Sequence, residues 1–168
     1  TTTSDYNPEE VAKQITIHTS LVPCEWNGIK INLLDTPGFS DFISEVKGAL
    51  RVSDTAMFVL SAVDGVEVQH EAVWEMTDEY NLPRIVFINK MDRENANFEK
   101  VLDDLKSKFK ANFVPVQIPI GSFDTFTGVV DIINGTAYEG TGKGDETSIP
   151  DELADDVAQY REQLLAAA

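Results

Sequence analysis

The chain has 168 residues, of which 42 % are hydrophobic and 25 % are charged, a balance typical of a globular domain rather than a disordered segment. Its 29 acidic and 13 basic residues give a formal net charge of −16, which argues against direct sequence-specific nucleic-acid binding by this segment, because such binding depends on Lys and Arg. The single cysteine, Cys24, excludes an internal disulfide, and no apolar run is long enough to span a membrane, so we expect a cytoplasmic protein without membrane contact.

The first part of the chain predicts a hairpin followed by a helix. Residues 15–26 are rich in β-branched and apolar types, Asn27-Gly28 is a two-residue turn signal, and residues 29–34 alternate apolar with polar side chains. Residues 41–52 then carry apolar side chains at helical spacing. We therefore expect two antiparallel strands and then a helix.

Two nearly continuous apolar runs, residues 55–62 and 84–88, predict parallel strands that are covered on both faces. Helical stripes follow each of them, at residues 68–80 and 98–109, before a further apolar strand at 114–120. Strand and helix alternate, which predicts for residues 1–120 an α/β fold with a mostly parallel sheet flanked by helices.

The pattern changes after Ile120. Residues 126–138 predict a second hairpin, which turns at Asn134-Gly135, residues 139–149 are a loop rich in Gly and charge, and residues 151–165 form an acidic helix. We interpret residues 121–168 as the start of a small α+β insertion subdomain.

The first candidate site is the run Asn89-Lys90-Met91-Asp92, directly after the strand at 84–88. At the carboxyl end of a parallel strand, side chains face the crevice in which open α/β sheets bind ligands. Asp92 could accept hydrogen bonds from both the ring N–H and the amino group of guanine, whereas adenine would leave the carboxylate unpaired. Lys90 could lay its stem over the base, and Asn89 could tie neighbouring loops together. The alternative is an ordinary surface loop, in which Asn, Lys and Asp are common.

The second candidate site, Asp35-Thr36-Pro37-Gly38, also ends a predicted strand. Asp35 could hold a water of a hydrated magnesium ion, because Mg²⁺ keeps several waters and takes few protein carboxylates. Gly38 would let a backbone N–H approach a terminal phosphate. The alternative is a tight turn, for which Pro and Gly are usual.

These two elements resemble the DxxG and NKxD motifs, the third and fourth guanine-nucleotide motifs of P-loop GTPases. Residues 35–74 followed by FINKMDR at 87–93 are similar to translational GTPases, and FTGVVDI at 126–132 resembles the extra subdomain of elongation factor G. The resemblance implies a partial GTPase domain from a GTP hydrolase that binds GTP or GDP with Mg²⁺ and couples hydrolysis to ribosomal translocation. Its implied partners are the GTPase centre and the stalk of the large ribosomal subunit.

The resemblance also assigns roles to individual residues. It places the nucleotide at Asn89, Lys90, Met91 and Asp92 and at the stretch from Asp35 through Thr36, Pro37 and Gly38 to Phe39. Ile15-Thr16-Ile17 resembles the end of switch I, which implies that Thr16 joins Asp35 in holding Mg²⁺. Gln14 stands where the family usually has Gly.

Phe39 occupies the position at which most translational GTPases have the His that orients the attacking water. A phenyl ring can neither donate nor accept a hydrogen bond, so we assign no catalytic residue and expect slow or differently assisted hydrolysis, as in a divergent elongation factor G-like branch. The alternative function is a nucleotide-responsive ribosome-binding module with weak or no hydrolysis. A third reading, a structural α/β piece without ligand, applies to this segment alone.

No G-x-x-x-x-G-K-[S/T] sequence and no fifth, Ser-Ala-type motif occur in the chain. The resemblance implies that the missing phosphate-binding loop follows a first strand, which would lie between the strands at 29–34 and 55–62 and leave exposed edges where it is absent. We therefore expect the chain to be part of a longer protein and, by itself, to be inactive.

Overall fold

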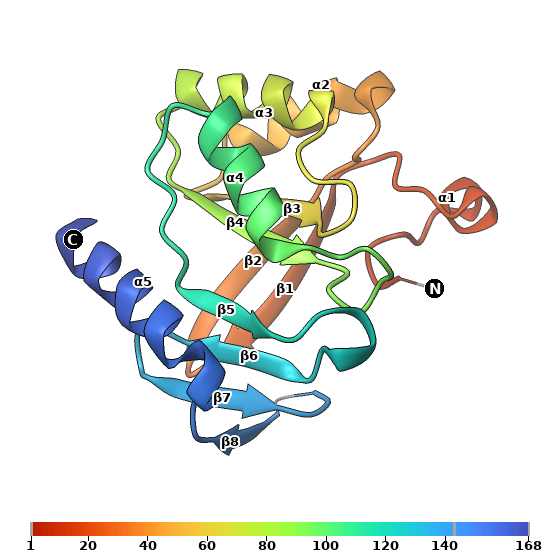
Figure 1. Cartoon of the computed structure of the whole chain (residues 1–168). Coiled ribbons are helices and arrows are strands. Elements are labelled where there is room, and N and C mark those ends of the chain that lie inside the picture. The colour runs from red at the N-terminus through yellow and green to blue at the C-terminus, as the bar shows by residue number, and fades with distance from the viewer. Residues whose placement is uncertain (1, 143, 168) are drawn as a thin grey trace. The chain divides into compact units, whose positions relative to one another are not determined.

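The computed structural model describes residues 2–142 and 144–167 (Figure 1). The chain divides into two compact units, of which the first comprises Thr1–Phe58 and Glu67–Val86 and the second Val59–Val66 and Phe87–Ala168. Helices and strands are present in both. The first unit contains α1 (Pro8–Lys13), β1 (Ser20–Trp26), β2 (Ile29–Asp35), η1 (Ser40–Phe42), α2 (Ile43–Leu50) and α3 (Val68–Glu79). The second contains α4 (Phe98–Lys108), β5 (Gln117–Ile120), η2 (Phe123–Thr125), β6 (Gly128–Asp131), β7 (Thr136–Glu139), β8 (Asp145–Thr147), η3 (Asp151–Leu153) and α5 (Ala154–Ala167).

The predicted first hairpin is confirmed. β1 and β2 pair antiparallel from Ser20 opposite Asp35 to Trp26 opposite Ile29. Asn27 and Gly28 both have positive φ, 49° and 75°, as a type I′ turn demands. The strand begins later than the sequence suggested, because the residues before Ser20 do not pair, and the short helix α1 was not predicted at all.

The remaining strands, β3 (Ala56–Ser61) and β4 (Arg84–Asn89), form the parallel pair that the apolar runs predicted. The N–H of Ala56 donates to the carbonyl of Pro83 at 2.9 Å, and the N–H of Ala62 donates to the carbonyl of Asn89 at 2.8 Å. Donor and acceptor are separated by the same number of residues at both ends, so the two strands run in the same direction.

The predicted single, mostly parallel sheet is not what the described residues form. Their strands make three sheets, β1-β2, β3-β4 and β5-β6-β7-β8, in a mixed α/β arrangement. The strand predicted at 114–120 appears as β5, which pairs antiparallel with β6 and not as a further parallel strand. An apolar run does not show whether its strand pairs parallel or antiparallel with a neighbouring strand, which explains this error. Within the described chain β2 pairs with β1, and β3 pairs with β4; the first strand expected between β2 and β3 stays a prediction.

The expectation that β3 and β4 are covered on both faces is also wrong for the described chain. On β3, Ala56, Phe58 and Leu60 are buried, whereas the alternating side chains Met57 and Val59 are more than half exposed. The exposed side chains of β4, Ile85 and Phe87, show the same alternation. Because successive side chains of a strand point to opposite faces, one face of this pair is packed and the other is open.

The second hairpin agrees with the sequence, and its sheet contributes to the core of the second unit. β6 and β7 pair antiparallel with Asp131 opposite Thr136, around the predicted turn at Asn134-Gly135. The core lies between this sheet and the helices α4 and α5, and its buried members are Leu102, Ile118, Ile120, Val130, Ile132, Ala137, Val157 and Tyr160. The predicted loop at 139–149 contains one unpredicted strand, the exposed β8.

Tyr160 connects α5 to α4 inside this core. Its hydroxyl donates to the carboxylate of Glu99, with distances of 3.2 and 3.3 Å to the two oxygens. Burial first, and the negative charge of Glu99 second, raise the pKa of Tyr160 to about 12. The phenol is therefore neutral at ordinary pH and acts as a hydrogen-bond donor that holds the acidic helix against the rest of the unit.

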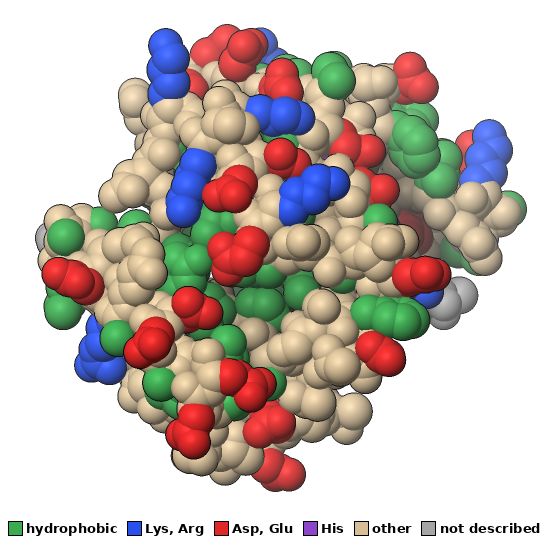
Figure 2. Space-filling model, in the orientation of Figure 1, with side chains coloured by type: hydrophobic (Ala, Val, Ile, Leu, Met, Phe, Trp, Pro, Cys, Tyr) green, Lys and Arg blue, Asp and Glu red, His purple; other side chains and the backbone are tan. Residues whose placement is uncertain are grey.

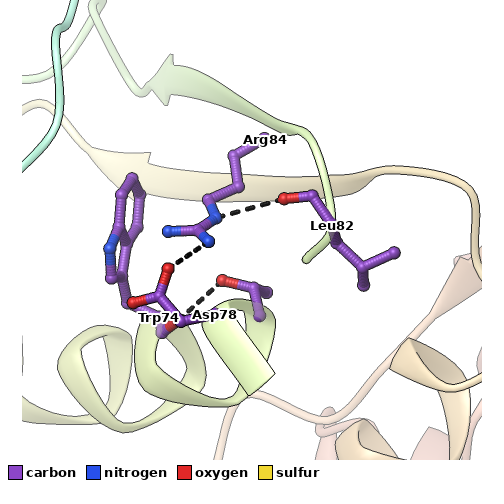
Figure 3. Close-up of polar contacts among 5 residues, drawn as sticks. Trp74, Asp78, Leu82 and Arg84 are labelled. Atoms are coloured by element: carbon purple, nitrogen blue, oxygen red, sulfur yellow. Dashed lines mark hydrogen bonds and ion pairs between the residues drawn. The ribbon is translucent and has the colours of Figure 1, made fainter. Parts of the chain in front are cut away.

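In the first unit, Arg84 joins β4 to α3 (Figure 3). Its guanidinium carbon lies 4.4 Å from the ring centroid of Trp74, its Nε donates to the carbonyl of Leu82, and it forms an ion pair with Asp78. Trp74 in turn packs against Phe58, with ring centroids 5.2 Å apart. This cluster combines a cation–π contact with the burial of two aromatic rings.

We expect Arg84→Met to lower the free energy of unfolding by about 1–3 kcal/mol, because it removes the cation–π contact and the charge-assisted hydrogen bonds and keeps most of the apolar stem. Urea denaturation measures the change. Arg51→Met, at an exposed arginine of the same unit, is the matched control and should have little effect. Equal stability of the two variants would contradict a stabilising role of the cluster.

Candidate functional site

The loop that follows β4 is held in a defined conformation by its own backbone. Lys90 has a φ of 63°, in the left-handed region. Its N–H donates to the side-chain oxygen of Asn89 at 2.8 Å, and its carbonyl accepts the N–H of Arg93 at 3.1 Å. The bond between Lys90 and Arg93 joins residues i and i+3, as in a β-turn. Asn89 therefore contributes to the loop in which it lies, and its predicted role of tying neighbouring loops together stays a prediction.

Met91 anchors the same loop in the core. It is buried in a cluster with Ala62 and Ala96, against which Phe98 and Phe126 also pack. Its neighbours on both sides, Lys90 and Asp92, are exposed. Because Met91 occupies the inward position, the two polar side chains that were predicted to contact a ligand are directed away from this core.

Lys90 and Asp92 line one cavity of about 530 Å³. Its other lining residues come from the turn after β3, from the residues after Asp92, and from η2: Ser61, Val63, Asp64, Arg93, Glu94 and Phe123. A volume in this range is typical of small-molecule sites and is large enough for a purine nucleoside. Lys90 and Asp92 thus lie at one cavity after the carboxyl end of β4, and their contact with a ligand stays a prediction.

The turn after β3 forms the opposite side of this cavity. The hydroxyl of Ser61 accepts the N–H groups of Val63 and Asp64, both at 3.3 Å, and the carbonyl of Ser61 accepts the N–H of Gly65 at 2.9 Å. Gly65 has a φ of 72°, and a Cβ at this position would lie 2.8 Å from Oδ2 of Asp104. The turn is therefore rigid, and sequence reasoning did not assign its side chains to the site.

Charge in the cavity is unevenly divided, because three carboxylates, Asp64, Asp92 and Glu94, face two cations, Lys90 and Arg93. Figure 2 shows the same excess at larger scale, with acidic side chains spread over the visible face of the described chain. Such a surface favours cationic or neutral hydrogen-bond donors over anions. This cavity by itself is suited to a ligand edge that donates hydrogen bonds.

The second predicted element begins where β2 ends. Asp35 is exposed, Pro37 is buried, and Phe39 is 56 % exposed at the start of η1. Gly38 has no positive φ, and a Cβ placed on it would meet no atom within 4 Å. Neither the backbone nor the packing of the described chain requires Gly at this position. The predicted reason for Gly38, the approach of a terminal phosphate to a backbone N–H, stays a prediction.

Thr16 lies in a short segment that two carboxylates hold. Its hydroxyl donates to Oδ1 of Asp5 at 2.9 Å. The N–H groups of Ile17 and His18 donate to Oε1 of Glu10 at 2.9 and 3.0 Å. Glu10 is only 1 % exposed, an unusual position for a carboxylate, and it was missed in the sequence. The one available signal was its place three residues after Asn7, which forms a capping box with it.

Gln14, which ends α1, has a φ of 55° and lies in the left-handed region that favours glycine. The residue expected from the resemblance at this position is Gly, and the structure gives the reason, since the chain must turn here after the helix. Gln14 keeps the turn at some conformational cost. The segment with Thr16 follows directly.

The predicted site residues fall in both units. Thr16 and the stretch from Asp35 to Phe39 belong to the first, and Asn89 to Asp92 belong to the second. Their convergence around one ligand therefore stays a prediction. Among residues 2–142 and 144–167, no three His, Cys, Asp or Glu side chains are grouped as a metal site, and none of the described helices is long and apolar enough to cross a membrane.

Hydrogen bonds from the backbone N–H groups of His18 and then of Ile17 lower the pKa of Glu10 below its ordinary value of 4.5. When the pKa of a carboxylate is lower in the folded chain than in the unfolded chain, the carboxylate stabilises the fold fully at any pH above its unfolded pKa. This stabilisation is lost as the pH falls through the lower pKa of the folded state. We expect the amide protection of Ile17 and His18, measured by NMR hydrogen exchange, to decrease over this acidic range.

Glu10→Gln should reduce that protection already at neutral pH and should flatten its dependence on pH, because the amide is a weaker acceptor than the carboxylate. The matched control is Glu9→Gln, at the exposed neighbouring position, and it should leave protection unchanged. Full protection in Glu10→Gln would show that the segment is held by other contacts.

Comparison with known proteins gives consistent matches. The family model described as the elongation factor Tu GTP binding domain matches residues 1–163. The chain is 45 % identical to elongation factor G of Thermotoga petrophila over 98 % of this chain and 24 % of that protein, and 43 % identical to an elongation factor G-like protein of Thermotoga maritima over 96 % of this chain and 25 % of that protein. It therefore spans about a quarter of the length of these relatives.

The fold comparison agrees with the sequence comparison. A crystal structure of a protein from Thermus thermophilus superposes with a TM-score of 0.92 at 33 % identity, over 99 % of this chain and 25 % of that chain.

Proposed function

The chain belongs to the elongation factor Tu GTP binding domain family, and on this premise we propose that it is part of an elongation factor G-like protein that hydrolyses GTP and couples hydrolysis to translocation on the ribosome. The observation that supports this most directly is the cavity after β4, which Lys90 and Asp92 line together. Asp92 accepts the two donors on the edge of guanine, and the stem of Lys90 covers one face of the base.

The other candidate residues would bind the phosphate end of the nucleotide and its magnesium ion. Thr16 and Asp35 would hold Mg²⁺, which neutralises phosphate charge during hydrolysis, with most of its ligands being water and phosphate oxygen. The exposed carboxylate of Asp35 and the half-buried hydroxyl of Thr16 fit this small set of oxygen donors. Gly38 supplies the backbone N–H for the terminal phosphate, in keeping with the empty space around it.

Three further features belong to the same proposal. The chain contains no phosphate-binding loop, so we expect it to be inactive by itself and its activity to need residues beyond this segment. The GTPase centre and the stalk of the large ribosomal subunit are the proposed partners. The proposed place of action is the cytoplasm, where translation takes place.

Asp92→Asn tests the guanine assignment. Exchanging one carboxylate oxygen for an NH₂ donor opposes a donor on guanine and matches an acceptor on xanthine. We expect affinity for GDP to fall on the order of 10²- to 10⁴-fold and the preference to shift to xanthosine diphosphate. Calorimetry on a protein that contains this chain together with a phosphate-binding loop measures both constants.

Glu94→Gln changes a second carboxylate that lines the same cavity and serves as the control, since it should alter GDP affinity by much less. Unchanged base preference in Asp92→Asn would remove the main support for a guanine-nucleotide site.

A second candidate function, a nucleotide-responsive ribosome-binding module with weak hydrolysis, is favoured by Phe39. This ring is 56 % exposed and has no hydrogen-bonding group with which to orient a water. This function is binding rather than catalysis, and GTP turnover with and without ribosomes separates it from the first.

Phe39→His should therefore raise ribosome-stimulated GTP turnover, by about 10²-fold or more if general-base orientation of water is the missing element. Phosphate release with and without ribosomes measures the gain. Phe39→Leu, which adds no hydrogen-bonding group, is the matched control. A turnover as low in Phe39→His as in Phe39→Leu would mean that this position does not limit hydrolysis.

A further inference from the structure

A phenylalanine outside both predicted motifs lies at the same cavity as Lys90 and Asp92. Phe123 begins η2, in the loop between β5 and β6, and its side chain is 46 % exposed although it is a large aromatic residue. It lines the cavity together with the residues that are proposed to bind the base. We propose that the Phe123 ring is a further nucleotide-binding residue that packs against the purine base. This inference rests on the proposed function of the cavity.

The backbone connects Phe123 directly to the base-recognition loop. Its N–H donates to the carbonyl of Met91 at 2.8 Å, and Met91 lies between Lys90 and Asp92 in the chain. The backbone of Phe123 is therefore tied to the residue that lies between the two polar side chains in the chain. All of these residues belong to the second unit.

The turn that presents Phe123 is held by several bonds. The N–H of Ser122 donates to the hydroxyl of Thr125 at 3.0 Å, and that hydroxyl donates to the carbonyl of Ser122 at 2.7 Å. Phe123 itself has a φ of 54°, a left-handed conformation that bulky side chains rarely adopt. A bulky residue kept in an unfavourable conformation by its surroundings points to a role for its side chain.

Phe126 of the same loop provides a contrast. It packs against the cluster of Met91, Ala62 and Ala96 and thus supports the loop from the core side. Phe123 belongs to no described core cluster and lies at the cavity instead. The two phenylalanines therefore have different surroundings, one structural and one open to a ligand.

The lining of the cavity explains why an aromatic ring would be useful there. Apart from Phe123 and Val63, the lining is polar or charged. A purine has hydrogen-bonding edges and apolar faces, so a carboxylate alone cannot cover it. Asp92 satisfies an edge, and Phe123 offers the aromatic surface that a base face prefers to water.

The test compares Phe123→Ala, Phe123→Tyr and the wild type in a protein that contains this chain with a phosphate-binding loop. The probes are GDP, which has a base, and inorganic pyrophosphate, which has none. We expect Phe123→Ala to weaken GDP binding about 5- to 150-fold and to leave pyrophosphate binding unchanged, because base–aromatic stacking acts only on the base. Phe123→Tyr keeps the ring and should bind GDP like the wild type.

Ile133→Ala, at another exposed apolar residue of the second unit, is the matched control. Equal loss of GDP and pyrophosphate binding in Phe123→Ala would assign the residue to loop stability and overturn the proposal. Unchanged GDP binding in Phe123→Ala, with binding still sensitive to Asp92→Asn, would overturn it too. Absence of GDP binding in the wild type would instead refute the proposed function.

Discussion

The arrangement of the cavity depends on the hydrogen bond from the N–H of Ala62 to the carbonyl of Asn89. This bond continues the parallel pairing of β3 and β4 to the carboxyl ends of both strands, so the turn after Ser61 and the loop from Lys90 begin side by side. The burial of Met91 against Ala62 then fixes which side chains face the core and which face the cavity. Without this pairing, Asp64 and Asp92 would not line the same hollow.

Because the chain is acidic, the base and the phosphates of the proposed ligand need different binding groups. A cavity with three carboxylates and two cations does not attract phosphates, but it suits the hydrogen-bond donors of a neutral base. The phosphates then require other positive groups, namely backbone N–H groups and a magnesium ion. In the proposal, the base end of the nucleotide therefore depends on residues of the second unit, and the phosphate end depends on residues of the first such as Asp35 and Gly38.

Features with a local physical cause could be predicted from the sequence. Asn27-Gly28 specified the first hairpin because its turn needs two positive φ values, and the apolar run at 84–88 placed Lys90 and Asp92 just after the end of a strand. Other features depend on distant contacts and could not be predicted. The apolar residues of β5 do not encode an antiparallel partner, and Glu10 sits in a run of charged and polar residues that suggests a solvated helix. Only its contacts with Ile17 and His18 show that it is internal.

The same contacts bear on how Thr16 would meet a cation. Its hydroxyl donates a hydrogen bond to Asp5, and a hydroxyl that is engaged as a donor still has lone pairs with which to bind a metal. In the proposed magnesium site, Asp5 would therefore orient the hydroxyl of Thr16, as carboxylates behind metal ligands generally do. Because Glu10 holds the backbone at Ile17 and His18, the segment is not free to move as a random loop. A nucleotide that reorganised this segment would have to break the hydrogen bonds to Asp5 and Glu10.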